Sequence, residues 1–323
     1  MAAPGARAPA DQELPLVHIV VLCWNGWEDT RECLESLRLV TYERVTVLVV
    51  DNGSTDGTPE RVAAGFPEFD LVCNPRNLGF AGGSNVGIRR ALAAGADYVA
   101  LLNNDTVVED SFLQPLLSAL QDPGIGAVSP EIRYHDRPHL AWFSGGAIDW
   151  RTGWAYHTPP DPSRRTGPTD TPIVTGCCVV VPRDVFLRVG DFDERFFLIY
   201  EDTDWSVRST RAGYRAVVVP ESRVLHKVSA SFRRDMPALG TFYFTRNGLL
   251  FISKHARRPV QVIVRFLWIW AVMPTLRQAR SREPGWGTLA LLRLMALGAH
   301  LVRRYGTAPS AATRIVDRWK ASA

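Results

Sequence analysis

The chain has 323 residues, 46% of them hydrophobic and 22% charged, so it can bury the core of one large domain or two modest ones. This composition excludes a disordered protein. The net charge of +4 is unevenly spread, because residues 255–323 carry 12 basic and 2 acidic residues whereas the preceding part carries 25 basic and 31 acidic ones. The end of the chain is therefore expected to differ in character from the rest.

Residues 1–14 lack the apolar core of a signal peptide and are expected to form a short disordered lead. The five cysteines show no metal-like spacing, and the adjacent Cys177 and Cys178 could hardly bridge each other without strain. These features favour a cytoplasmic protein in a reducing setting.

Apolar runs alternate with amphipathic stretches in the first half of the chain, which predicts an α/β fold with a mostly parallel sheet and helices on both faces. Three short apolar runs predict inner strands, at residues 16–22, 45–50 and 97–102. Polar or acidic starts and a Gly stop predict helices at residues 29–40, 84–95 and 109–121.

The pattern loosens over residues 125–182, which are rich in Gly, Pro and Trp and predict loops with a mixed or antiparallel edge. A helix is expected at 201–214, followed by a strand at 215–220. Neither the GxGxxG fingerprint nor a P-loop is present, which argues against a dinucleotide-binding oxidoreductase and a P-loop NTPase.

Residues 231–323 are expected to be helical. Arg265 and Arg293 interrupt their apolar runs, which look too short to cross a bilayer, since a span needs about 20 residues. Apolar faces rich in Leu and Trp, flanked by arginines, favour helices that lie on an anionic membrane surface. An amphipathic pair that packs on the preceding domain would show the same pattern.

Two of the predicted strands run into polar residues. "VVDNGSTDG" (49–57) places Asp51 and Asn52 after one strand, and "LLNNDTVV" (101–108) places Asn103, Asn104 and Asp105 after another. In an open α/β sheet the ligand crevice lies beyond the carboxyl ends of the strands, so both groups are candidate ligand contacts. Both are also rich in turn-forming residues and could be simple Asx turns.

Taken together, these segments resemble the inverting nucleotide-sugar glycosyltransferases of family 2, which have the GT-A fold, and in particular rhamnosyltransferase-like members. "VVDNGSTDGT" (49–58) is similar to their VVDxxSxDgt segment, and "NPRNLGFAGGSNVGI" (74–88) to their nucleotide-sugar loop. "GDFDERFFLIYEDTDWSVRSTRAGY" (190–214) resembles their acceptor-side segment. The resemblance covers residues 16–230 and implies a catalytic domain at 15–230, followed by a membrane-associating region at 231–323.

The resemblance implies that a nucleoside-diphosphate sugar, dTDP- or UDP-linked, is the donor. "NND" stands where Asp-x-Asp is usual and resembles the rhamnosyltransferase-like form, which favours dTDP. The residues implied in nucleotide-sugar binding are Cys23, Asn25, Asp51, Asn52, Arg76, Asn77, Gly82, Asn85, Asn103, Asn104 and Asp105.

A divalent metal, Mg²⁺ or Mn²⁺, is the implied cofactor. Asp105 is the carboxylate that "NND" retains, and one or two carboxylates plus substrate phosphates commonly suffice for such ions. His226 resembles a metal-binding histidine of related galactofuranosyltransferases and is the implied second ligand, although a lone histidine is more often structural. The change at "NND" is also compatible with a metal-independent or inactive relative.

Adjacent carboxylates follow the apolar run "FFLIY". The resemblance makes Asp202 the general base, with Glu201 beside it in the same motif. A charged first turn of a helix is the simpler explanation, but the apolar run should hold these acids near a buried crevice, where a pKa can be tuned. Three residues are expected near the acceptor, namely Trp205, Gly176 and Asp204.

Aromatic and basic residues elsewhere allow two interpretations. Trp142, Trp150 and Trp154 could stack on sugar rings or belong to the core. Arg246 could approach the diphosphate or have a packing role.

The sequence thus predicts transfer of a sugar, with rhamnose a candidate, to a glycan or polyprenyl-diphosphate-linked acceptor at the inner face of the cell membrane. A nucleotidyltransferase is one alternative, but "VVLCWNGWED" offers no Gly-rich phosphate loop with Lys or Arg. A non-catalytic protein that binds carbohydrate or nucleic acid is another. Because the arginines of the tail are interleaved with aliphatic runs, nucleic acid is not an expected partner.

Overall fold

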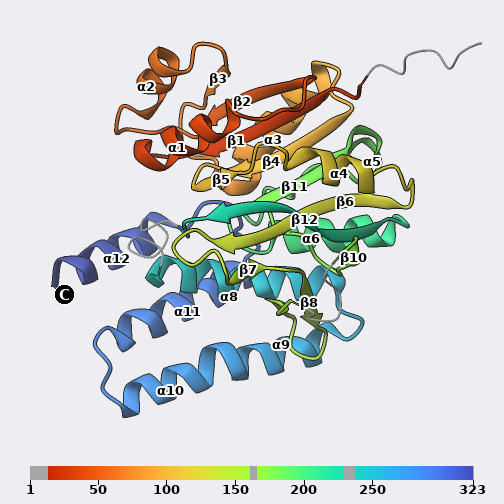
Figure 1. The fold of residues 1–323 in the computed structure, drawn as a ribbon. Coiled ribbons are helices and arrows are strands. Elements are labelled where there is room, and N and C mark those ends of the chain that lie inside the picture. Colours follow the sequence, from red (N-terminus) through yellow and green to blue (C-terminus); the bar gives the residue numbers. More distant parts are fainter. Residues whose placement is uncertain (1–13, 161–165, 229–236, 323) are drawn as a thin grey trace, which may run out of the picture.

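The computed structural model describes residues 14–160, 166–228 and 237–322, so all but the last residue of the predicted lead lies outside the described residues. One mixed sheet dominates the described part, with strand order β10-β12-β6-β11-β4-β1-β2-β3 and with β5 and β7 added on β12 and β6 (Figure 1). Four strands pair in parallel as one half of this sheet: β1 (Val17–Cys23), β2 (Val45–Asp51), β3 (Asp70–Cys73) and β4 (Tyr98–Asn103). The predicted parallel α/β core is therefore confirmed.

The other half of the sheet is mixed. β11 (Cys178–Pro182) runs antiparallel to β4 and β6, whereas β6 (Ile125–Tyr134) and β12 (Arg215–His226) are parallel to each other. Short strands complete the pattern: β5 (Thr106–Val108), β7 (Ala141–Phe143), β10 (Thr169–Asp170), and a separate hairpin of β8 (Gly146–Asp149) and β9 (Trp154–His157).

The prediction of loops from residue 125 is wrong for β6, a ten-residue strand whose first six residues are buried. Pro130 hid it, because proline rarely occupies an interior strand. The structure tolerates Pro130 where its partner β12 is irregular, between Val219 and Arg223.

Helices cover both faces of the sheet: α1 (Trp27–Leu37), α2 (Thr58–Gly65), α3 (Gly79–Ala93), α4 (Leu113–Ala119), α5 (Arg183–Val189) and α6 (Glu201–Arg211). α3 starts five residues before the predicted start at Ser84. A Cβ atom on Gly83 would lie 2.5 Å from Leu22 Cδ1, and one on Gly87 2.1 Å from Val20 Cγ1. These glycines allow α3 to press against β1, so they belong to a helix and not to a loop.

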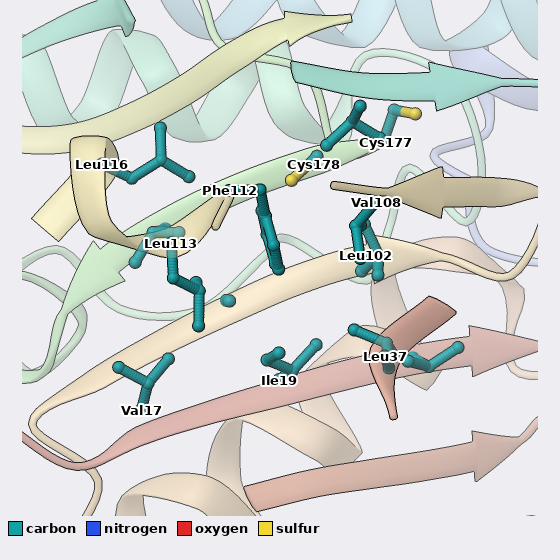
Figure 2. Close-up of a cluster of buried hydrophobic side chains, with 14 of the residues drawn as sticks. Val17, Ile19, Leu37, Leu102, Val108, Phe112, Leu113, Leu116, Cys177 and Cys178 are labelled. Carbon is teal, nitrogen blue, oxygen red and sulfur yellow. The ribbon is translucent and has the colours of Figure 1, made fainter. Parts of the chain in front are cut away.

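Buried aliphatic side chains form a core on each face of the sheet. Because successive strand residues point to opposite faces, Val17 and Ile19 join one cluster while Val20 joins the other. Figure 2 shows the first cluster, in which Phe112 and Leu113 lie over β4 and β1. The two cores fix the carboxyl ends of β1, β2 and β4 relative to one another.

The chain ends in a helical layer: α8 (Pro237–His255), α9 (Pro259–Leu267), the π-helical turn η1 (Trp268–Val272), α10 (Met273–Arg280), α11 (Trp286–Leu301) and α12 (Ser310–Ser322). α9 and α10 lie on the side of the molecule opposite β2 and β3 (Figure 1). Residues 259–280 form one 22-residue helix that is long and apolar enough to cross a membrane, by length and composition. The expectation that no apolar run here is long enough is therefore corrected, because Arg265 does not end the helix.

Candidate active site

The polar strand ends meet at one edge of the sheet. In the parallel register Cys23 lies opposite Asp51, and Leu22 lies opposite Asn103. The loops that follow β1, β2 and β4 therefore converge, as expected for the ligand-binding edge of a parallel sheet.

Asp51 is 1% exposed and shapes the loop after β2. Its Oδ1 accepts hydrogen bonds from the backbone N–H groups of Gly53 (3.1 Å) and Ser54 (2.9 Å), the geometry of an Asx turn. The Cys23 thiol lies 3.7 Å from its Oδ2, and burial raises the pKa of this thiol well above its usual range. Asn25 joins the neighbouring loop, because its Oδ1 accepts a 2.9 Å bond from the Thr55 N–H.

Asn52 has its side-chain partners within the protein. Its Nδ2 donates to Asn77 Oδ1 (3.2 Å) and to the Gly79 carbonyl (3.0 Å), and its Oδ1 accepts from Asn74 Nδ2 and the Leu78 N–H, each at 3.1 Å. The predicted nucleotide contact is thus a brace that fixes the 74–79 loop.

Asn85 also braces the scaffold, since it exchanges 2.9 Å bonds with the backbone of Phe192. Arg76 is exposed at the tip of the loop. A Cβ atom on Gly53 would lie 2.7 Å from the Arg76 backbone, so this close approach requires glycine, whose φ there is +78°. Gly82 is buried in α3, and a Cβ atom on it would lie 2.9 Å from Cβ of Leu78, the residue directly before the helix. The loop is therefore held firmly, and Arg76 makes no ion pair within residues 14–160, 166–228 and 237–322.

Asp105 and His226 form the candidate metal pair. Their Oδ2 and Nε2 atoms lie 3.2 Å apart, and the residues are 7% and 6% exposed. Mg²⁺ binds ligands at about 2.0–2.1 Å in octahedral geometry, which places adjacent ligand atoms about 3 Å apart, so this pair fits the edge of such a site. Nδ1 of His226 is buried and has no hydrogen-bond partner among the residues that the structure describes. Within residues 14–160, 166–228 and 237–322 no group of three or more potential ligands gathers, so substrate phosphates and water would have to complete the coordination.

The two amides before Asp105 differ in their contacts. Asn104 Nδ2 donates a 2.8 Å bond to Thr30 Oγ1 and so ties the turn to α1. Asn103 ends β4, and its N–H donates a 2.9 Å bond to the Cys177 carbonyl. Asn103 therefore connects the "NND" turn to the segment that carries Gly176.

Asp202 lies on the other side of that segment, in the first turn of α6. Its Oδ2 accepts a 3.1 Å bond from the Gly176 N–H, and its Oδ1 accepts a 2.6 Å bond from the Thr203 N–H. The charges of Asp105 and Asp202 both raise the pKa of the intervening Cys177, after the larger effect of its burial. The candidate metal ligand and the candidate base therefore both lie near residues 176–177.

Burial raises the pKa values of both adjacent acids, Glu201 and Asp202. Asp202 retains hydrogen-bond donors that stabilise its ionised form, whereas Glu201 Oε2 is buried without a partner among the described residues and also faces the charge of Asp202. The environment therefore favours a proton on Glu201 more than on the candidate base Asp202.

His157 is a site residue that the sequence did not reveal. It comes from β9, and its ring packs edge-on against Trp142, whose ring contacts His226 with centroids 4.4 Å apart. Burial lowers the pKa of His157, and the charges of Asp202 and His226 also act on it. Its Nδ1 lies 3.0 Å from the Trp142 carbonyl, which can only accept, so Nε2 of the neutral ring carries no proton. The sequence contains no local signal for His157, because the fold of the β8–β9 hairpin places it beside Trp142.

Two predicted acceptor contacts are corrected. Trp205 is 2% exposed, packs on Phe186 and donates to the Gly190 carbonyl, so it belongs to the core. Asp204 is fully buried and bound to three basic side chains: Lys254 (2.5 Å), His255 (2.7 Å) and Arg208 (2.9 Å). Asp204 is two positions after Asp202 and so points to the opposite side of α6, whereas Trp205 lies nearer the face of Asp202 but is covered by Phe186.

Arg246 packs inside the protein. It is fully buried and donates to the carbonyls of Gly306 (2.6 Å) and Phe196 (3.2 Å), which leaves no path to a diphosphate. Burial lowers its pKa to about 10. Trp150 stacks on Phe251 and Trp154 packs on Trp270, so these two tryptophans join the hairpin to the C-terminal helices. Of the predicted aromatic set, Trp142 is the one that lies beside a candidate ligand.

A mixed sheet whose parallel strands end at this polar edge is the GT-A type of glycosyltransferase fold. Two solved structures share it. A Pyrobaculum calidifontis mannosyltransferase, PcManGT, in complex with GDP-Man and Mn²⁺ is 21% identical with a TM-score of 0.55, covering 99% of this chain and 84% of that one. GalNAc-T7 with UDP, GalNAc and Mn²⁺ is 16% identical with a TM-score of 0.58, covering 85% and 59%.

Residues 18–190 match the family described as Glycosyl transferase family 2, and the chain belongs to this family. A Mycobacterium tuberculosis N-acetylglucosaminyl-diphospho-decaprenol L-rhamnosyltransferase is 32% identical over 243 residues, 67% of this chain and 78% of that protein. A Shigella flexneri dTDP-rhamnosyl transferase, RfbF, is 24% identical over 65% of this chain and 71% of its own length. The chain is therefore a glycosyltransferase, and neither a nucleotidyltransferase nor a non-catalytic binding protein.

Proposed function

We propose that this enzyme transfers a sugar with inversion, from a dTDP- or UDP-linked donor to a glycan or polyprenyl-diphosphate-linked acceptor, with rhamnose as the sugar. The observation that carries the proposal is that Asp202 and the Asp105–His226 pair both lie near residues 176–177. The names of the relatives support the donor and the acceptor class, since one is a dTDP-rhamnosyl transferase and another acts on a diphospho-decaprenol.

In this proposal Asp202 accepts the proton of the acceptor hydroxyl as that oxygen attacks the anomeric carbon from the face opposite the leaving nucleotide. The hydrogen bonds from Gly176 and Thr203 hold the carboxylate in place. Glu201 keeps its proton and so limits the negative charge beside the base. A divalent cation, Mg²⁺ or Mn²⁺, held by Asp105 and His226 would neutralise charge on the departing diphosphate.

The nucleotide would lie along the loops after β1, β2 and β4. Asp51 and Asn25 shape these loops, and the exposed Arg76 offers a cation toward the nucleotide. Asn52, Asn77 and Asn85 act in this proposal by positioning the loop, because their amides are engaged within the protein.

The C-terminal helices would hold the enzyme on the inner face of the cell membrane. Exposed apolar residues recur at four-residue spacing along the 259–280 helix, so they form one stripe: Val260, Val264, Trp268, Val272 and Leu276. Exposed arginines flank it at positions 258, 265, 277 and 280. Such a stripe with a cationic border matches the surface of an anionic bilayer.

The first test is calorimetric titration of dTDP and UDP, with and without Mn²⁺, into the wild type and Asp105→Asn. We expect one nucleotide to bind tighter with Mn²⁺, and the variant to lose that gain while it keeps the metal-free affinity. Binding of neither nucleotide by the folded protein, or an unchanged Mn²⁺ effect in the variant, would refute the proposed site.

Membrane placement is tested by vesicle co-sedimentation of the double variant Val264→Ser/Trp268→Ser. The control is Leu39→Ser/Leu187→Ser, which removes apolar residues of similar exposure, 69% and 62%, from the main domain. We expect binding to fall in the first variant and not in the control. Equal binding by all three proteins would remove the membrane surface from the proposal.

A further inference from the structure

A cavity of about 1040 Å³ lies at the other end of α6 and β12 from Asp202 and His226. It is formed by the first residues of β12, the end of α6, the β8–β9 turn and the start of α9, elements that gather at the right of Figure 1. β12 connects the two sites, with Arg215 at the cavity and His226 at the metal pair. The neighbouring strand β6 covers the same span from Ile125 to Tyr134, so at about 3.3 Å per strand residue Arg215 and His226 are roughly 30 Å apart.

The cavity carries an excess of positive charge. Arg257, Arg258 and Arg265 line it, are exposed, and make no ion pair or side-chain hydrogen bond within the described part of the chain. The lining acid is Asp170, which is paired with Arg215 at 2.9 Å. The three arginines are therefore available to an anion, and guanidinium groups bind phosphate oxygens in bidentate fashion.

The walls between these arginines are apolar. Ile148, Trp150 and Val207 line one side, and Val262 of α9 lines the other. Trp150 is 44% exposed although its ring stacks on Phe251, so it presents an apolar face to the cavity. A simple inorganic anion would contact the arginines but leave the apolar walls exposed to water. An amphiphile with a phosphate would contact both the arginines and the apolar walls.

The cavity also lies at the start of the apolar stripe. Val262 and Arg265 line the cavity, and Val260 and Val264 of the same helix are 73% and 62% exposed. A lipid whose acyl chains lie in the bilayer beside this stripe could therefore place its headgroup among the arginines.

We propose that this cavity binds the headgroup of an anionic phospholipid, with its phosphate between Arg257, Arg258 and Arg265 and its glycerol and first methylenes against Trp150 and Val262. The inference rests on the membrane part of the proposed function and does not depend on the sugar-transfer reaction. It makes membrane binding selective for lipid charge at one defined point of the molecule.

The test is calorimetric titration of the full chain with dihexanoyl phosphatidylglycerol below its micelle concentration, with dihexanoyl phosphatidylcholine, and with inorganic phosphate. The cavity variant is Arg257→Gln/Arg265→Gln. Its matched control, Arg277→Gln/Arg280→Gln, removes the same charge from exposed arginines at the other end of the helix. We expect phosphatidylglycerol to bind the wild type and the control alike, and the cavity variant about thirtyfold more weakly, at the strength typical of two arginines near an anionic lipid.

Three results would overturn the inference: no binding of monomeric phosphatidylglycerol, equal weakening by both double variants, or inorganic phosphate binding as tightly as the lipid. The last result would indicate a free-phosphate site. Co-sedimentation with phosphatidylglycerol vesicles separates the two proposals. If the wild type binds vesicles but not the monomeric lipid, the cavity proposal fails and membrane association stands; if it binds neither, both fail.

Discussion

Two buried His–Asp pairs in this enzyme have different surroundings. His226 and Asp105 are 3.2 Å apart, and within the described part of the chain the other ring nitrogen of His226 has no partner. His255 and Asp204 are 2.7 Å apart, the other ring nitrogen of His255 lies 2.9 Å from Arg211, and Lys254 and Arg208 also contact Asp204.

The difference separates a structural pair from a candidate site. Asp204 is neutralised by basic side chains, which lower its pKa despite burial. In the Asp105–His226 pair, by contrast, the contacting atoms are Oδ2 and Nε2, 3.2 Å apart, and these are the two atoms that a cation would take as ligands. Nδ1 on the other side of the ring would not contact that cation. The same residue types therefore serve cohesion in one place and, in our proposal, chemistry in the other.

The largest effect is expected at Asp202, which belongs to the candidate site together with Asp105 and His226. Asp202→Asn removes the proposed base and should lower kcat by about 10²–10⁴-fold, the usual contribution of general-base catalysis. The control is Asp184→Asn, an exposed aspartate in the first turn of α5. Initial rates with donor and acceptor measure the effect, and nucleotide affinity should be unchanged. A variant that retains most of its activity would exclude Asp202 as the base.

The second effect is on stability. Asp204→Asn leaves Lys254 and His255 without their anion, and breaking a buried ion pair from one side typically costs about 3–5 kcal/mol. The control is Glu35→Gln. Glu35 pairs with Arg31 four residues away on α1, the same spacing as Asp204 and Arg208 on α6. The Glu35 pair lies at the surface, where ion pairs contribute about 0–1 kcal/mol. Urea unfolding measures both. Similar losses in the two variants would show that Asp204 is not a buried anchor.

The sequence predicted the strand ends better than the faces of α6. Asp51, Asp105 and the first strands follow from local signals, apolar runs that end in polar turns. Asp202 and Asp204 look alike in sequence, and burial alone separates the half-buried candidate base Asp202 from the fully buried Asp204. That burial depends on α8, which supplies Lys254 and His255.

The sequence could not reveal contacts made by distant segments. His157 reaches the site because the β8–β9 hairpin brings it beside Trp142, and Asn85 is engaged by the backbone of Phe192. β6 escaped detection because its one proline and one glycine obscure the apolar pattern of a buried strand. Each of these outcomes depends on which segment lies alongside, which a local pattern does not encode.

The comparison of histidines gives a third prediction. His226→Gln should leave the free energy of unfolding nearly unchanged and abolish the Mn²⁺ gain in nucleotide binding. His255→Gln should cost about 1–3 kcal/mol of stability, because it disrupts a buried charge-assisted hydrogen bond, and should keep the Mn²⁺ gain. Calorimetric titration and urea unfolding of both variants provide the measurements. The reverse result would mean that the two pairs have been assigned the wrong way round.

The smallest effect is expected at Glu201, next to the base. Because burial raises the pKa of Glu201 and its Oε2 has no partner, the side chain is protonated, and Gln reproduces that state. Glu201→Gln should therefore stay within about tenfold of the wild-type rate, less than the loss of a general base.

The pH dependence of stability provides the sharper measurement. The folded wild type binds more protons than the unfolded chain between the ordinary glutamate pKa and the raised one, so Glu201 lowers stability progressively as pH rises through that window. Glu201→Gln removes this loss, and its unfolding free energy relative to the wild type should increase with pH. A difference that is independent of pH would place the shared proton on Asp202, and the adjacent acids would then exchange the roles proposed for them.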